Sequence, residues 1–142
     1  KERLQDQFKD HTAGRRYVSV VEGRVQEMAF TVRSFLAENA AYRVYSTRDH
    51  RIGKQAVTHV KVLRRTARAS FVEVQLETGR KHQIRVHLAE RGHPIIGDKA
   101  YGSSSNPIRR LALHAVQLDF KHPMSGEHMT MRSPYPKAFD RL

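Results

Sequence analysis

The sequence predicts a single α+β domain with a mainly antiparallel mixed sheet and flanking helices and loops. Segments that alternate between apolar and polar residues follow one another with short connections, which is typical of antiparallel pairing. Few stretches show helical spacing, and the chain of 142 residues has the length of about one domain with a buried core.

The first part of the chain predicts one polar helix and then strands. Residues 1–11 place Leu4 and Phe8 four apart on one helical face. Residues 16–21 are rich in β-branched and aromatic side chains and are ended by Gly23, which favours a strand. We expect further strands at 28–36 and 42–45 and a basic loop at 50–54.

The middle of the chain predicts an antiparallel hairpin. Residues 57–63 and 71–76 both alternate, for example with Val60 and Val62 on either side of Lys61. A basic connection, 64–69, joins them, and the period of two places one face of the pair inward.

The last part predicts one helix and a second strand pair. Residues 82–91 fit both a strand and a helix by periodicity, but Gly92 followed by Pro94 is a helix-stop signal, so we expect a helix. The remaining expectations are a loop at 97–107, strands at 111–120 and 128–131 with a turn at 123–126, and a short helix within 134–142.

Charge and composition indicate a nucleic-acid partner. The 26 Lys and Arg outnumber the 14 Asp and Glu, giving a net charge of +12 and a pI near 10.6. Such a balance favours a polyanion, nucleic acid ahead of a membrane surface. The chain has no cysteine, which excludes disulfides and thiolate metal sites. No apolar run has the length of a membrane span and no signal peptide is recognised, so we expect a cytoplasmic protein.

The segment from Leu76 to Leu88 carries the most chemistry. It combines Gly79 with positive charge and directional donors that suit phosphates, carboxylates or base edges. Its nitrogen-rich side chains are Arg80, Lys81, His82, Gln83, Arg85 and His87.

Several alternative sites are disfavoured by their spacing. His82 and His87 are five apart with no zincin glutamate, so polar packing or an RNA contact is favoured over a metal site. The serines at 103–105 have no nucleophile-elbow sequence. Arg85, between two apolar residues, needs an anionic partner if buried, and a solvated position is an equal alternative. Tyr17 fits either a half-buried core tyrosine or a base-stacking residue.

Several ordered blocks resemble the RluA-type pseudouridine synthases. The block T-G-R-K-H-Q-I-R-V-H at 78–87 is similar to their signature, and residues 92–102 resemble their H-P-hydrophobic-hydrophobic-G-D-x-x-Y-G segment. Residues 15–23 resemble their second motif, 53–59 their G-K-x-A-x-T segment, and 113–123 their closing strand.

The resemblance implies an isomerase that converts specific uridines of ribosomal or transfer RNA to pseudouridine without cofactor or metal. Tyr17 matches the tyrosine that stacks on the target base, and Arg85 the arginine that ion-pairs with the catalytic aspartate. Arg80, His82, Gln83, Ile84, Ile95 and Ile96 fall at positions that we assign to substrate binding. We assign phosphate contacts to Arg48, Arg51, Lys54, Arg64, Arg65, Arg68 and Lys81. The expected partner is structured RNA, with no DNA and no membrane, and we expect a monomer.

One family motif does not occur in this sequence. The H-R-L-D-x-x-T-S-G motif, with the nucleophilic aspartate, lies before the second motif in the family, and none of the aspartates here has that context. We therefore expect residues 1–142 to be the C-terminal portion of a catalytic domain, inactive alone. Attack on the ribose and proton abstraction both stay open as roles of the aspartate. The alternative function is a non-catalytic basic RNA-binding domain.

Overall fold

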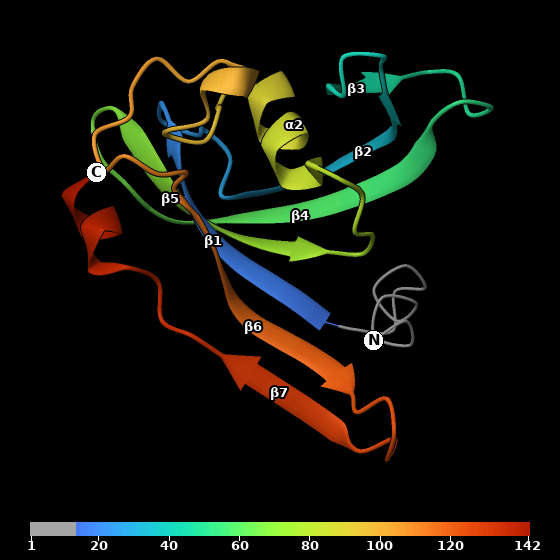
Figure 1. Cartoon of the computed structure of the whole chain (residues 1–142). Coiled ribbons are helices and arrows are strands. Elements are labelled where there is room, and N and C mark those ends of the chain that lie inside the picture. Colours follow the sequence, from blue (N-terminus) through green and yellow to red (C-terminus); the bar gives the residue numbers. More distant parts are fainter. Residues whose placement is uncertain (1–13) are drawn as a thin grey trace.

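The computed structural model describes residues 14–142, which form one seven-stranded antiparallel sheet in the order β3-β2-β4-β5-β1-β6-β7 (Figure 1). The strands are β1 (Gly14–Glu22), β2 (Ala29–Glu38), β3 (Val44–Thr47), β4 (Lys54–Arg65), β5 (Ala69–Leu76), β6 (Leu113–Lys121) and β7 (His128–Arg132). The α+β class and the mainly antiparallel sheet predicted from the sequence are confirmed.

The central strands of the sheet carry apolar side chains, and a helix covers these side chains on one face. Helix α2 (Gln83–Glu90) lies over one face of the sheet and contacts β3 and β4, while the β6–β7 hairpin extends away from it (Figure 1). Ile84 and Leu88 of the helix belong to one buried cluster with Val60 of β4 and Val74 of β5, which are cross-strand partners. Each such side chain, once fully buried, contributes about 1.5–3 kcal/mol.

Most of the predicted elements are present, with shifted ends. The hairpin is confirmed, but β4 has 12 residues and starts at Lys54, inside the predicted basic loop. The helix predicted at 82–91 is confirmed as α2. A 3-10 helix, η1 (Lys99–Tyr101), interrupts the predicted loop at 97–107, and the tail ends in a second one, η2 (Lys137–Arg141). The helix expected at 1–11 lies outside the described residues.

The segment between α2 and β6 is fixed to β1 by backbone hydrogen bonds. Ile96 N donates to Val20 O at 3.0 Å, and Ala112 N donates to Ile96 O at 2.9 Å. Gly97 follows with φ of +89°, and a Cβ there would lie 2.3 Å from the carbonyl oxygen of Arg110. Only glycine tolerates both constraints, so this turn places Asp98 reproducibly. Within residues 14–142, no helix is long and apolar enough to cross a membrane.

Candidate active site

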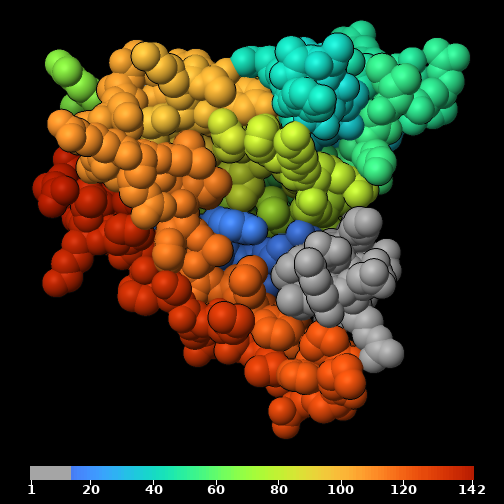
Figure 2. Space-filling view, in the orientation of Figure 1, coloured from blue at the N-terminus to red at the C-terminus, as the bar shows by residue number. Residues whose placement is uncertain are grey.

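A cavity of about 260 Å³ lies where β1, the β5–α2 turn and the start of α2 meet. Figure 2 shows β1 at the bottom of a hollow between the yellow-green segment around α2 and the orange β6 region. The cavity is lined by Arg15, Tyr17, Leu76, Gly79, Arg80, His82, Gln83, Ile84, Arg85 and Leu113. It therefore brings together Tyr17 and Arg85, the two residues that the sequence singled out as catalytic, although they lie far apart in the chain.

Tyr17 is oriented by an irregularity in its strand. The pairing of β1 with β6 shifts register between Arg16 and Tyr17, and such bulges redirect the side chains next to them. Tyr17 is partly buried against the core. Burial raises the pKa of its phenol, and the charge of Arg15 opposes that rise. The ring is therefore neutral at physiological pH, as a stacking platform or a hydrogen-bond donor requires.

Arg85 has a carboxylate partner within this chain. Its Nε donates to Asp98 Oδ2 at 3.0 Å and its Nη2 to Asp98 Oδ1 at 2.9 Å, a two-point ion pair. The Asp98 side chain is 1% exposed and that of Arg85 is 23% exposed. The hydrogen bonds that Arg85 donates to Asp98 raise the pKa of the guanidinium. The solvated alternative for Arg85 is thus wrong, and its need for an anionic partner is met first by Asp98.

Gly79 leaves room for a second cavity-lining arginine. A Cβ at this position would lie 1.8 Å from Arg15 Nη1, so any larger residue would collide with that guanidinium. Arg15 itself is 7% exposed, and burial lowers its pKa. Since arginine stays protonated in proteins, the cavity wall carries the charge of Arg15 beside Tyr17.

His82 joins the cavity to the η1 segment. It has a left-handed backbone, with φ of 55°, and its Nδ1 lies 3.0 Å from the hydroxyl of Tyr101. That hydroxyl also accepts a hydrogen bond from Val44 N at 3.0 Å, so Tyr101 links the imidazole to the start of β3. Burial, together with the nearby charges of Arg85 and Lys81, lowers the pKa of His82, which favours the neutral imidazole.

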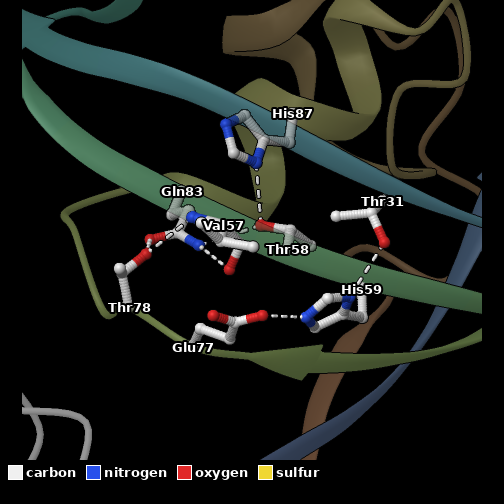
Figure 3. A network of polar contacts seen from close by, with 8 residues as sticks. All are labelled: Thr31, Val57, Thr58, His59, Glu77, Thr78, Gln83 and His87. Atoms are coloured by element: carbon white, nitrogen blue, oxygen red, sulfur yellow. Dashed lines mark hydrogen bonds and ion pairs between the residues drawn. The ribbon is translucent and has the colours of Figure 1, made fainter.

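Gln83 and His87 have structural roles in a buried polar network (Figure 3). Gln83 Nε2 donates to Val57 O and Thr58 Oγ1, and its Oε1 accepts from Thr78 Oγ1 and from Arg80 N. All four bonding positions of the amide are occupied inside the protein, so Gln83 lines the cavity without a free polar group, and its assignment to substrate binding stays a prediction.

His87 extends the same network to β2. Its Nδ1 lies 2.7 Å from Thr58 Oγ1 and its Nε2 lies 2.8 Å from Ser34 Oγ. The side chain is fully buried, and burial lowers its pKa to about 4. The polar-packing interpretation of His87 is therefore the right one, and within residues 14–142 no group of three or more potential metal ligands occurs.

The three isoleucines assigned to substrate binding separate into two environments. Ile84 lines the cavity and is 5% exposed. Ile95 and Ile96 do not line it; they are 0% and 6% exposed and belong to the main core, where Ile95 bridges to Val21. Ile95 and Ile96 therefore support the core beneath the site, and a direct role of these two residues in substrate binding stays a prediction.

The seven basic residues expected to contact phosphate do not form one surface. Arg48 and Arg51 lie in the loop between β3 and β4, and Lys54 is the first residue of β4. Lys81 lies in the β5–α2 turn beside the cavity. Arg64 and Arg65 end β4, about 35 Å along the strand from Lys54, and Arg68 follows in the β4–β5 turn. In that second group, Arg64 pairs with Asp140 and Arg65 donates to backbone carbonyls, so both already have structural partners.

Two residues of the site were missed by sequence reasoning. Asp98 was not assigned a role, although it lies in the same family-like block as Tyr101, and Arg15 was not assigned one either. The adjacency of Arg15 to a matched residue and the position of Asp98 in the G-D-x-x-Y-G block were the signals that could have found them.

Comparisons with known proteins identify the family of this chain. Residues 1–90 match the family model described as RNA pseudouridylate synthase. An uncharacterized RNA pseudouridine synthase of Synechocystis is 41% identical over 144 residues, covering 98% of this chain and 44% of that protein. Ribosomal large subunit pseudouridine synthase D of Zymomonas mobilis is 38% identical over 150 residues, covering 98% and 47%.

A solved structure extends the match to three dimensions. The human RNA pseudouridylate synthase domain containing 1 superposes with a TM-score of 0.80 at 27% identity, covering 97% of this chain and 62% of that one. The chain spans about half the length of the curated relatives it matches. It belongs to the RNA pseudouridylate synthase family, in the RluA-type group whose motifs it carries.

Proposed function

We propose that the protein to which this chain belongs isomerises uridine to pseudouridine in structured RNA. The observation that carries the proposal is that Tyr17 and Arg85 line the same cavity. Residues 1–142 supply the base-stacking tyrosine and the anchoring arginine, and the nucleophilic aspartate comes from residues outside them. Ribosomal and transfer RNA are the proposed substrate classes, and the proposed location is the cytoplasm.

The residues of the cavity have separate tasks in this reaction. The target uridine leaves its stack and enters the cavity, as enzymes acting on a base require. The bond between N1 and C1′ breaks, the uracil rotates, and C5 forms the new bond to C1′. Tyr17 holds the detached uracil by stacking, and Arg85 favours the ionised form of the aspartate, since an opposite charge within a few ångströms lowers a carboxyl pKa. No cofactor or metal has a place in this proposal.

We expect the isolated 142-residue chain to show no turnover, and the full-length protein to modify RNA. The reason is that the H-R-L-D context of the nucleophile does not occur in the 142 residues. Both proteins are incubated with cellular RNA, and pseudouridine is mapped by chemical modification and primer extension. Turnover by the isolated chain would contradict the assignment of the nucleophile. RNA binding without turnover by the full-length protein would favour the non-catalytic alternative.

RNA binding is expected to be mainly electrostatic and to weaken steeply with salt, because the net charge is +12. Lys54→Ala with Lys81→Ala removes two charges from a pocket that shares Gly79 and Arg80 with the cavity. Arg64→Ala with Arg68→Ala removes two charges at the far end of β4. We expect the first pair to lower the slope of log affinity against log salt by about 1.5, and the second to change it by less than half as much. Equal slopes for the two pairs, measured by filter binding over several salt concentrations, would argue against a cavity-centred RNA surface.

A further inference from the structure

The ion pair of Arg85 uses only part of its guanidinium. Nε and Nη2 are bound by the two oxygens of Asp98. Nη1 has no hydrogen-bond partner within residues 14–142, and the side chain lines the cavity. Because a guanidinium is a rigid planar fork, fixing two nitrogens also fixes the direction of the third.

Asp98 is itself held firmly. Its backbone N donates to Ile95 O at 2.9 Å, and its carbonyl oxygen accepts from Ser103 N at 3.0 Å. The neighbouring Tyr101 places its ring centroid 5.0 Å from the Arg85 guanidinium carbon, so that Arg85 is held by a carboxylate and by an aromatic face. The hydroxyl of the same Tyr101 meets His82 at the cavity wall.

From this geometry we infer that Asp98 is a positioning residue: it directs Nη1 of Arg85 toward the catalytic carboxylate and offsets part of the charge of Arg85. The inference rests on the proposed function, because the second carboxylate is the nucleophile of the complete enzyme. Arg85 is then shared by two carboxylates, and the nucleophile meets an arginine whose attraction is weakened by Asp98. The pKa of the nucleophilic carboxyl is therefore higher than it would be beside an arginine that Asp98 did not share.

The charge balance around the pair makes the effect measurable. In the described residues Asp98 is the one carboxylate in contact with Arg85. The other titratable or charged groups that face the pair or its immediate neighbours are Arg15, Tyr17, Glu38, Arg43, Arg80, Lys81, His82, Glu90, Lys99 and Tyr101. Most of these are cationic or neutral, so removing the charge of Asp98 leaves a strongly positive site.

The test is the pH dependence of kcat/KM in the full-length protein with Asp98→Asn. Asparagine has nearly the same shape but no charge, so Arg85 acts on the nucleophile at full strength. We expect the acid limb of the profile to shift to lower pH by about one unit. We also expect kcat to fall about tenfold, with KM changed much less, because the direction of Nη1 is no longer fixed at two points.

The control is Glu27→Gln, which removes one carboxylate charge from an exposed arginine pair, that with Arg91, outside the cavity. It should leave the acid limb in place. Asp98→Glu keeps the charge on a longer side chain, and it should return the acid limb toward its original position while kcat stays reduced. This second variant separates charge from shape and also serves if Asp98→Asn folds poorly.

Each result decides between the inference and its alternatives. If the wild type turns over and the pH profile of Asp98→Asn superimposes on the wild-type profile after scaling, Asp98 has only a structural role. In that case the inference fails and the proposed function stands. A wild-type protein without turnover overturns the proposed function and the inference with it. The pair itself is checked independently by NMR, in which the Nε–H proton of Arg85 should exchange slowly in the wild type and at least tenfold faster in Asp98→Asn.

Discussion

Arg85→Ala in the full-length protein is expected to lower turnover at least about a hundredfold. It would leave the catalytic carboxylate without its cationic partner, at a cost of about 2–5 kcal/mol of local interaction, and each 1.4 kcal/mol is about tenfold in rate. RNA affinity should change much less, since Arg85 is one of 26 basic residues. Turnover is measured at saturating RNA, and affinity is measured separately by titration.

The structure adds a second consequence of the same substitution. Asp98 is 1% exposed, and without Arg85 it becomes a buried carboxylate with no cation, which destabilises the fold by about 3–5 kcal/mol. Circular dichroism and a denaturant titration must therefore accompany the assay. Arg85→Lys keeps a charge near Asp98 but loses the planar fork, so it should fold better and still turn over slowly. Arg91→Ala, which removes a more exposed arginine paired with Glu27, is the matched control. Weak RNA binding with normal turnover at saturation would instead make Arg85 a phosphate contact.

His87 is expected to make the folded state about 3 kcal/mol less stable at pH 4 and below than at pH 7. Burial lowers its pKa from an ordinary 6.5 to about 4, and a pKa difference of one between the folded and unfolded states corresponds to about 1.4 kcal/mol. The unfolded chain therefore binds the proton first as the pH falls. The contribution of His87 to the free energy of unfolding is fully present above pH 6.5, and it is lost progressively as the pH falls to about 4.

The measurement is urea denaturation of the wild type and of His87→Gln over this pH range. Other histidines and carboxylates contribute equally to both proteins, so the difference between them isolates His87. We expect that difference to shrink by about 3 kcal/mol from pH 7 to pH 4. His50→Gln, in an exposed loop, should show no comparable change. A constant difference between wild type and His87→Gln would mean that the buried imidazole accepts a proton without cost to the fold.

Local patterns determined most of the secondary structure and the identity of the family. Alternation within 57–63 and 71–76 was enough for the hairpin, because the side chains of a strand point to opposite faces with a period of two. The stop signal of Gly92 and Pro94 resolved the ambiguous segment before it in favour of a helix. Tyr17 and Arg85 were singled out by ordered motifs, and those motifs are matched by the family comparison.

Only the tertiary structure decided which partners the polar side chains of the motif bind. Gln83, His87 and Arg85 lie within one short polar segment, yet the helix directs the first two to hydrogen-bond partners on β2 and β4 and the third to Asp98. Sequence spacing carries no information about such partners, because they come from strands and loops far away in the chain. The same reason applies to the separation of the basic residues: Lys54 and Arg65 are near in sequence, but an extended strand holds them at opposite ends of the sheet.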